Sequence, residues 1–387
     1  MKGNLSMFIK KIFLIIILIF SLFTLTGCYN TTGIDKQYFA ISLGLDVGSD
    51  DLLKLSIQIP FPSSYTSSGS SDTSQSTKYQ IYSVEAESID ECISILNNYL
   101  NKKINLSHCS ALVISEELAR KGLETYINTL TNNTELRHSC EIIISATTSQ
   151  EILEKVSNSG EVFSARLFDY LSTTSEYTGY TIKSTFGDFF QALDNDYYEP
   201  SCIYASIYDD TIQTNGISIF KDDCMVGHID VSNSISYLII SNELNTCPIT
   251  INNPFKESEK LDLEISLYKN TDISIDIING SPFISIIVYP EGTIKSSGSI
   301  FNYLDDNRIS KVEEETASYL KKILEDYLYT ISKKYNSDIV GFKGIYQSSF
   351  LTKEEFDLIH WDEIFQDSFF NIELKTRINS SNLFNKE

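Results

Sequence analysis

Carboxylate pairs, histidines and cysteines are the side chains of this sequence whose types could support chemistry. Paired acids occur at Asp209–Asp210 and Asp222–Asp223, and such pairs can serve in acid–base catalysis. Both pairs lie at apparent turns, which Asp favours because its side chain bonds to nearby backbone N–H groups, so a turn role is the favoured interpretation. The histidines lie far apart and have no Cys, Asp or Glu at a spacing typical of metal ligands: His108, His138, His228 and His360.

The sequence contains no catalytic signature. We find no GxSxG elbow, no P-loop, no HExxH pair and no GxGxxG after a strand, and we therefore predict no enzyme activity, no cofactor and no metal. Six cysteines besides Cys28 are too widely spaced for a zinc ribbon or a redox CxxC motif. The sequence is compatible with disulfides and with buried free thiols at these six positions, which are Cys92, Cys109, Cys140, Cys202, Cys224 and Cys247.

Cys28 is the residue whose setting predicts a definite reaction. Lysines at the N-terminus precede the apolar run 12–23, and the small-residue stretch Leu25-Thr26-Gly27-Cys28 follows. This order indicates a secretory signal over residues 1–27, and a Leu three residues before a Cys resembles the bacterial lipobox, in which the thiol is diacylated. A plain transmembrane anchor is the alternative, but about fourteen apolar residues span a bilayer poorly.

Lipidation of Cys28 would hold the rest of the chain at the outer face of a membrane, because two acyl chains anchor a protein stably. The formal net charge is −22. This charge argues against nucleic acid as a partner and against close adsorption of the whole body to anionic lipid headgroups.

The elements that follow the anchor alternate between strand and helix patterns. A hairpin is predicted over 39–46 and 53–59, and helices that begin at the capping residues Ser88, Ser115 and Thr148 alternate with buried strands. Such alternation is typical of a mixed or parallel α/β layer. Strand patterns dominate the later sequence, at 214–220, 224–229, 261–268, 273–278, 283–289 and 369–378. A long amphipathic helix is predicted over 311–334, with Ser310 and Glu313 as its capping box.

We therefore predict an α+β (mixed α/β) fold of three domains with mixed sheets and a long amphipathic C-terminal helix. The expected domains are an N-terminal mixed α/β domain over 28–198, a middle β-rich domain over 199–259 and a C-terminal α+β domain over 260–387. The Ser-rich stretch 62–78 is expected to be a flexible loop.

Six local patterns, in this order, resemble the Ger(x)C family, the C subunits of spore nutrient germinant receptors. Tyr29 and Asn30 depart from the family's Trp-Asp after its lipid-bearing Cys. The patterns are Gly27–Asn30, His108 with Ala111–Leu123, Glu135–Arg137, Gly216–Gly227, Asp338–Phe342 and Trp361–Phe370.

The resemblance implies a non-enzymatic lipoprotein, palmitoylated at Cys28, on the outer face of the spore inner membrane. It implies multi-pass A and B subunits as partners and a nutrient ligand bound elsewhere in the complex. A solute-binding lipoprotein of an uptake system is the alternative, but such proteins have two repeated lobes, and no repeat is visible here.

Overall fold

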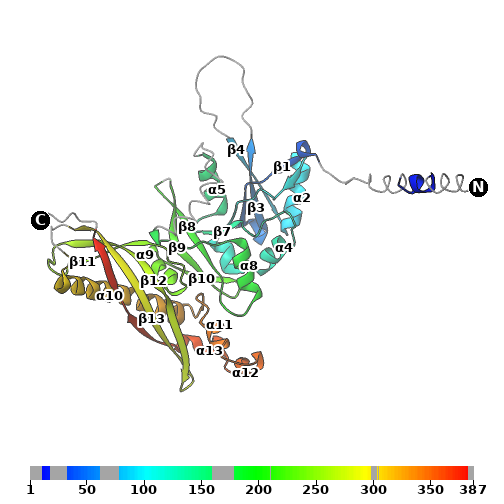
Figure 1. The fold of residues 1–387 in the computed structure, drawn as a ribbon. Helices are drawn as coiled ribbons and strands as arrows, with labels where there is room; N and C mark the ends of the chain where they lie inside the picture. Colours follow the sequence, from blue (N-terminus) through cyan, green and yellow to red (C-terminus); the bar gives the residue numbers. More distant parts are fainter. Residues whose placement is uncertain are drawn as a thin grey trace, which may run out of the picture.

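The computed structural model of the chain describes residues 11–17, 33–61, 78–158, 178–209, 211–297, 303 and 305–381. Cys28 and residues 62–77 of the predicted Ser-rich loop lie outside these ranges. Within them, no helix combines the length and the apolar character needed to cross a membrane. The fold is mixed α/β, as predicted, with several mixed sheets and a long C-terminal helix (Figure 1).

An eight-stranded sheet forms the N-terminal region, in the order β10-β9-β8-β7-β6-β2-β3-β4. Its central strands β2, β6, β7 and β8 run parallel, and the strands on either side of them pair antiparallel. The strands are β2 (Ser42–Val47), β3 (Leu53–Phe61), β4 (Lys78–Ala86), β6 (Ala111–Ser115), β7 (Glu141–Ser145), β8 (Ser201–Tyr208), β9 (Thr211–Lys221) and β10 (Cys224–Ile229).

Helices cover both faces of this sheet, so its central strands are buried on both sides. In β6, Leu112 and Ile114 belong to one hydrophobic core, and Ala111 and Val113 belong to another on the opposite face. Two-sided burial explains why the strand reads as a continuous apolar run. The first core includes α2 (Ile89–Leu100), α3 (Glu116–Lys121), α4 (Glu124–Thr131) and α8 (Phe186–Asp194), and the second includes α5 (Ser149–Asn158).

The predicted caps of these helices are present, with one correction. The hydroxyls of Ser88, Ser115 and Thr148 each accept a backbone N–H three residues later. The single helix predicted after Ser115 is wrong, because the chain forms α3 and α4 with a break at Gly122. Gly122 has φ +111°, a conformation that interrupts a helix and that L side chains rarely adopt.

A five-stranded sheet forms the C-terminal region around one long hairpin. The hairpin turn is Asn279-Gly280, and both residues have positive φ, as a two-residue hairpin turn requires. Strands predicted separately at 261–268 and 273–278 are one strand, because irregularities in the pairing between Leu267 and Asp272 do not end it. The strands are β11 (Cys247–Asn252), β12 (Lys260–Ile278), β13 (Ser281–Ser297), β14 (Phe369–Leu374) and β15 (Arg377–Ser381).

The long helix α10 (Asp306–Tyr329) packs against one face of this sheet and continues as a π-helical turn over Thr330–Lys334. Its predicted start at Ser310 is wrong. The helix begins one turn earlier, with Asp305 as its N-cap, and the Glu313 carboxylate accepts the backbone N–H of Ile378 in β15 at 3.0 Å. The Glu313 side chain, which the local pattern assigns to a helix cap, therefore forms a tertiary contact with β15.

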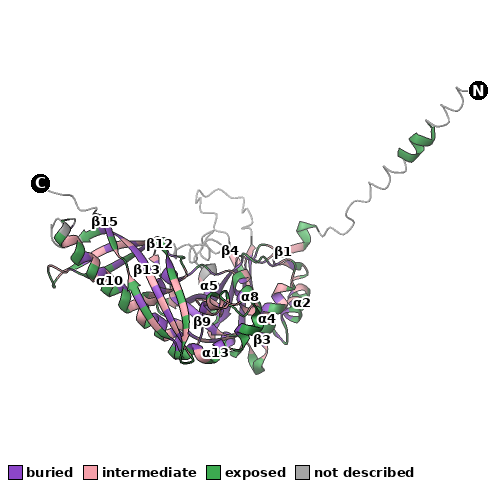
Figure 2. Cartoon of the chain, turned by 60° about the horizontal axis from the view of Figure 1, so that its bottom comes forward, coloured by how far each residue is buried: buried purple, intermediate pink, exposed green. Residues whose placement is uncertain are grey.

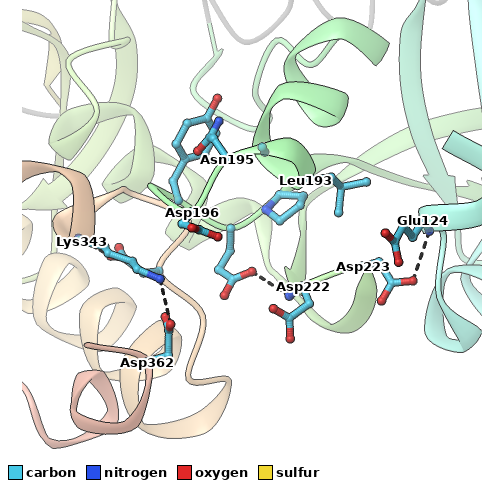
Figure 3. Close-up of a pocket in the computed structure, with 13 residues that line it drawn as sticks. Glu124, Leu193, Asn195, Asp196, Asp222, Asp223, Lys343 and Asp362 are labelled. Atoms are coloured by element: carbon cyan, nitrogen blue, oxygen red, sulfur yellow. Dashed lines mark hydrogen bonds and ion pairs between the residues drawn. The ribbon is translucent and has the colours of Figure 1, made fainter. Parts of the chain in front are cut away.

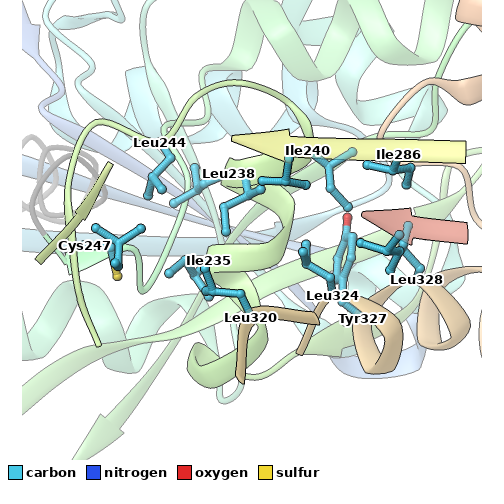
Figure 4. Packing of buried hydrophobic residues seen from close by; sticks show 14 of the residues in the cluster. Ile235, Leu238, Ile240, Leu244, Cys247, Ile286, Leu320, Leu324, Tyr327 and Leu328 are labelled. Carbon is cyan, nitrogen blue, oxygen red and sulfur yellow. The ribbon is translucent and has the colours of Figure 1, made fainter. Parts of the chain in front are cut away.

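The two sheets share one hydrophobic core. Helix α9 (Val231–Ile240) lies between them and contributes Ile235 and Leu238, which face Leu324 and Tyr327 of α10 (Figure 4). Ile217 and Ile219 of β9 belong to the same core as Ile284 and Ile286 of β13. No helix is predicted over 231–240 from the sequence, where serines alternate with larger residues as they do in a strand.

The division of the chain at residues 198 and 259 stays a prediction, and the eight-stranded sheet continues from β7 to β10 across the first of these positions. Three short helices follow α10 at the lower edge of the molecule in Figure 1. They are α11 (Phe342–Gln347), α12 (Lys353–Asp357) and α13 (Trp361–Ile364).

Candidate functional site

A crevice of about 250 Å³ lies where the N-terminal sheet meets the chain that follows α10 (Figure 3). Acidic side chains predominate in its lining, and Lys343 is the one basic residue there. The lining residues are Glu124, Ala192, Leu193, Asn195, Asp196, Tyr198, Glu199, Pro200, Asp222, Asp223, Asp338, Lys343 and Asp362. Residues from both regions therefore form the crevice. We call the contact between the two regions at this crevice the joint.

A chain of charged pairs lies at the joint, and its Lys221–Asp362 pair connects the two regions. Glu199 lies just before β8 and accepts Lys221 Nζ at 2.6 Å and the Asp222 backbone N–H at 2.7 Å. Lys221 also lies 3.7 Å from Asp362, whose carboxylate accepts Lys343 Nζ at 2.8 Å. Burial raises the pKa of Glu199, and its hydrogen bond to Lys221 opposes that shift. This chain of pairs links the start of β8, the β9–β10 turn and α13.

Asp338 is the most deeply buried carboxylate of the crevice. It accepts the backbone N–H groups of Gly341, Phe342 and Lys343 at 3.0, 3.0 and 2.7 Å, which fixes the turn before α11. Its own carbonyl accepts the Glu199 N–H at 3.0 Å. Burial raises the Asp338 pKa to about 6, against the opposing effect of the three N–H donors.

Two glycines of the β9–β10 hairpin allow another part of the chain to approach closely. Gly216 has φ +109°, and a Cβ there would lie 1.8 Å from the Ile229 carbonyl oxygen of the paired strand. A Cβ on Gly227 would lie 2.3 Å from the Tyr335 ring, which comes from beyond α10. The Tyr335 hydroxyl also donates to the His228 carbonyl at 3.1 Å. Both glycines therefore permit close packing, one within the hairpin and one across the joint.

The joint is arranged to hold two regions together. Asp223 accepts the Glu124 backbone N–H at 3.1 Å, and Asp196 pairs with Lys353 at 3.0 Å, so these carboxylates are also engaged in structural contacts. Among the residues that the structure describes, no group of three or more His, Cys, Asp or Glu side chains is placed to hold a metal ion.

The histidines singled out in the sequence are not brought together. His108 packs edge-on against Phe39 at 4.6 Å, and His138 lies 6.1 Å from Phe186. His228 stacks on Tyr204 at 4.3 Å, and its Nε2 lies 3.7 Å from Asp230. His360 precedes α13 with φ +50°. Each has a separate structural environment.

The six described cysteines are free thiols, and all except Cys224 are buried. Cys109 and Cys140 approach most closely, with their sulfur atoms 3.9 Å apart. That separation is a contact between thiols, because a disulfide bond is about 2.0 Å long. Burial raises the pKa of the Cys202 and Cys247 thiols to about 12, which keeps them protonated and unreactive.

The acidic pairs lie in turns, as predicted. Asp222 has φ +53° between β9 and β10, and Asp209 has φ +45° at the end of β8, with Asp210 outside the described residues. The contacts of Glu199 with Lys221 and with this turn are not predicted from the sequence. The segments Asp338–Phe342 and Trp361–Phe370, which resemble the family, were the sequence features that pointed to the joint, because each contributes a residue to it.

Comparisons with known proteins agree with this architecture. Residues 30–207 match the family described as "Spore germination protein N-terminal domain", and residues 215–382 match "Spore germination B3/ GerAC like, C-terminal". The chain is 22% identical to spore germination protein KC of Bacillus subtilis (strain 168), with 86% of each chain covered. It is 19% identical to spore germination protein GerQC of Bacillus cereus, with 95% of this chain and 98% of the other covered.

The fold also resembles a solved structure. The crystal structure of the GerBC protein matches 87% of this chain and 96% of its own, with a TM-score of 0.56 and 16% identity. The two family matches, which lie on either side of the β8–β9 turn, and the relatives that match over most of their length give the same assignment. The chain belongs to the Ger(x)C family of spore germination proteins, the germinant receptor C subunits.

Proposed function

We propose that this chain is the lipid-anchored, non-enzymatic C subunit of a spore nutrient germinant receptor. The carrying observation is that the family matches extend over residues 30–207 and 215–382, so the similarity begins two residues after Cys28. A diacylated Cys28 would then hold the folded body at the outer face of the spore inner membrane.

The anchor and the joint suggest how such a subunit works. Confinement to a membrane raises the effective concentration of the body around multi-pass A and B subunits, so a modest interface is enough for assembly. The ion pairs Lys221–Asp362 and Lys353–Asp196 and the shared core hold the two regions as one body, which can present a fixed surface to those partners. In this proposal the nutrient binds elsewhere in the complex.

Affinity capture of the tagged chain from spore membranes in mild detergent tests the proposal. We expect two multi-pass partners, one of them transporter-like, identified by mass spectrometry. The Cys28→Ala variant should lose most of these partners while it keeps the thermal midpoint of the native chain. Capture of a nucleotide-driven permease in place of the two partners would contradict the proposal and support a solute-binding lipoprotein.

Thermal unfolding with amino acids and sugars separates the same alternatives. A protein that binds a ligand only when folded gains stability with that ligand, by about 2.7 kcal/mol at one hundred times the dissociation constant. We expect no gain for this chain alone. A reproducible gain with one nutrient would place the ligand site here.

A further inference from the structure

The chain enters the folded body beside the end of helix α2. The first described residues of the body lead into β1 (Gln37–Phe39), which pairs in parallel with β5 (Lys103–Asn105) directly after α2. This pairing places Lys36 beside Lys102 and Lys103. These three lysines line one shallow depression with Asn97, Asn101 and one acidic residue, Asp35. We define the β1–α2 face as Ile34, Lys36, Ile95, Tyr99, Lys102 and Lys103.

Apolar side chains of this face are exposed to an unusual degree. Ile34 is 78% exposed, Tyr99 71% and Ile95 40%. Ile95 and Tyr99 are four residues apart on α2 and therefore share its outer side. After Glu91 the exposed residues of α2 carry no charge, so the acidic character of the protein does not extend over this end of the helix.

The lysines of the face stand out in a chain of net charge −22. Lys103 pairs with Glu135 at 2.5 Å. Lys102 lies 4.6 Å from the centre of the Tyr38 ring. Neither Lys102 nor Lys36 forms an ion pair with another residue of the described part of the chain. Two positive charges on this face are thus available to an outside anion.

The length of the tether limits how far this face can lie from Cys28. Four residues lie between Cys28 and Gly33, where the described body begins, and a fully extended chain over these five residue steps spans at most about 18 Å. An anchor at Cys28 therefore keeps the β1–α2 face close to the bilayer whatever path the tether takes. The C-terminal sheet lies at the opposite end of the molecule from α2 in both overall views (Figures 1 and 2).

We propose that the β1–α2 face rests on the lipid headgroups of the membrane that holds the anchor. The proposal rests on the proposed lipidation of Cys28. Tyr99 suits the headgroup region because its ring is apolar and its hydroxyl is polar, and Ile34 and Ile95 can enter the boundary with the acyl chains. Lys36 and Lys102 are attracted to anionic headgroups, while the acidic remainder of the body is repelled. The face thereby orients the C-terminal sheet away from the membrane.

Fluorescence quenching in vesicles tests this orientation. The chain has a single Trp, Trp361, which is 2% exposed and gives a constant background. Tyr99→Trp and Ile34→Trp report on the face, and Tyr208→Trp, at the end of β8 and 69% exposed, is the matched control. Each lipidated full-length chain is reconstituted in phosphatidylcholine and phosphatidylglycerol vesicles that contain brominated acyl chains.

We expect quenching of the two face variants well beyond that of Tyr208→Trp, and a decrease in this difference for Lys36→Gln/Lys102→Gln or in vesicles without phosphatidylglycerol. Equal quenching at all three positions, in a chain that mass spectrometry shows to be acylated, would overturn the inference. Shielding of Tyr99→Trp only when membrane partners are present would assign the face to a protein and also overturn it. Absence of acylation would instead refute the proposed function itself, and the mass spectrum distinguishes that case.

Discussion

The two sheets of this protein differ in how many of their faces are covered by helices. Helices cover both faces of the eight-stranded sheet, and its central strands β6 and β7 are buried at every position. The five-stranded sheet packs one face against α10, and buried residues alternate with more exposed ones along β11 and along much of β12, whose alternation is visible in Figure 2. A strand that helices cover on both faces is therefore buried along its whole length, whereas a strand covered on one face alternates between buried and exposed residues.

The regions also differ in what they contribute to function. The N-terminal region carries the tether and the β1–α2 face, and the C-terminal region lies at the far end of the body. The joint and the core around α9 connect them. If this connection is as firm as its contacts indicate, perturbing one region must affect the other, and the following predictions test that.

The largest effect is expected from Leu324→Ala in α10. Leu324 is fully buried in the core that also contains Ile217 and Ile219 of β9, and removing a buried Leu side chain costs about 3 to 4 kcal/mol. Hydrogen exchange should show lost protection in β9 as well as in α10. Native protection in β9 would mean that the two sheets unfold independently. Leu358→Ala, at a side chain 79% exposed, is the control and should be nearly neutral.

Asp338 should make the joint sensitive to pH. Its pKa is raised from 3.8 to about 6 in the folded protein, so the folded state binds more protons between these values. Its contribution to stability is therefore fully present below pH 4 and is lost as the pH rises through 6, by about 3 kcal/mol at most.

The measurement is denaturant unfolding of the native chain and of Asp338→Asn from pH 4 to pH 7. We expect the difference in unfolding free energy between the two chains to shift against the native chain as the pH rises. Parallel pH profiles would show that the Asp338 carboxyl titrates normally.

Gly227→Ala should weaken the joint by about 2 kcal/mol, because the added Cβ requires the Tyr335 ring to move. In Gly227→Ala/Tyr335→Ala the obstacle is gone, so the double variant should lose less than the sum of the two single variants. Thermal unfolding of the four chains measures this coupling. Additive losses would show that Gly227 matters for a reason other than its contact with Tyr335.

The smallest effects compare two ion pairs of the N-terminal region, one at the joint and one on the surface. Lys221→Met leaves Glu199, whose side chain is 13% exposed, without its main partner and should cost about 2 kcal/mol. Lys103→Met breaks the more exposed pair with Glu135 and should cost less than about 1 kcal/mol. Raising the salt concentration should reduce the second loss more than the first. Equal losses would mean that the joint pair is screened like a surface pair.

Local signals predicted much of the fold. The capping residues Ser88, Ser115 and Thr148 and the hairpin of β9 and β10 are all present where the sequence indicates them. These features depend on residues within a few positions of one another, so a linear pattern contains the information. The failures have tertiary causes, as where Glu313 bonds to β15 and not to its own helix end.

The sequence by itself predicted a lipidation site at Cys28 and determined the acidic net charge, the alternating elements and the resemblance to the Ger(x)C family. Only the tertiary structure decided that Glu199, Lys221, Asp338 and Asp362 form one joint, and that Lys36 lies beside Lys102 on one face. Residues more than a hundred positions apart meet because the shared core brings two sheets together. The periodicity of a strand or helix specifies which side is apolar, but it does not specify which other element will cover that side.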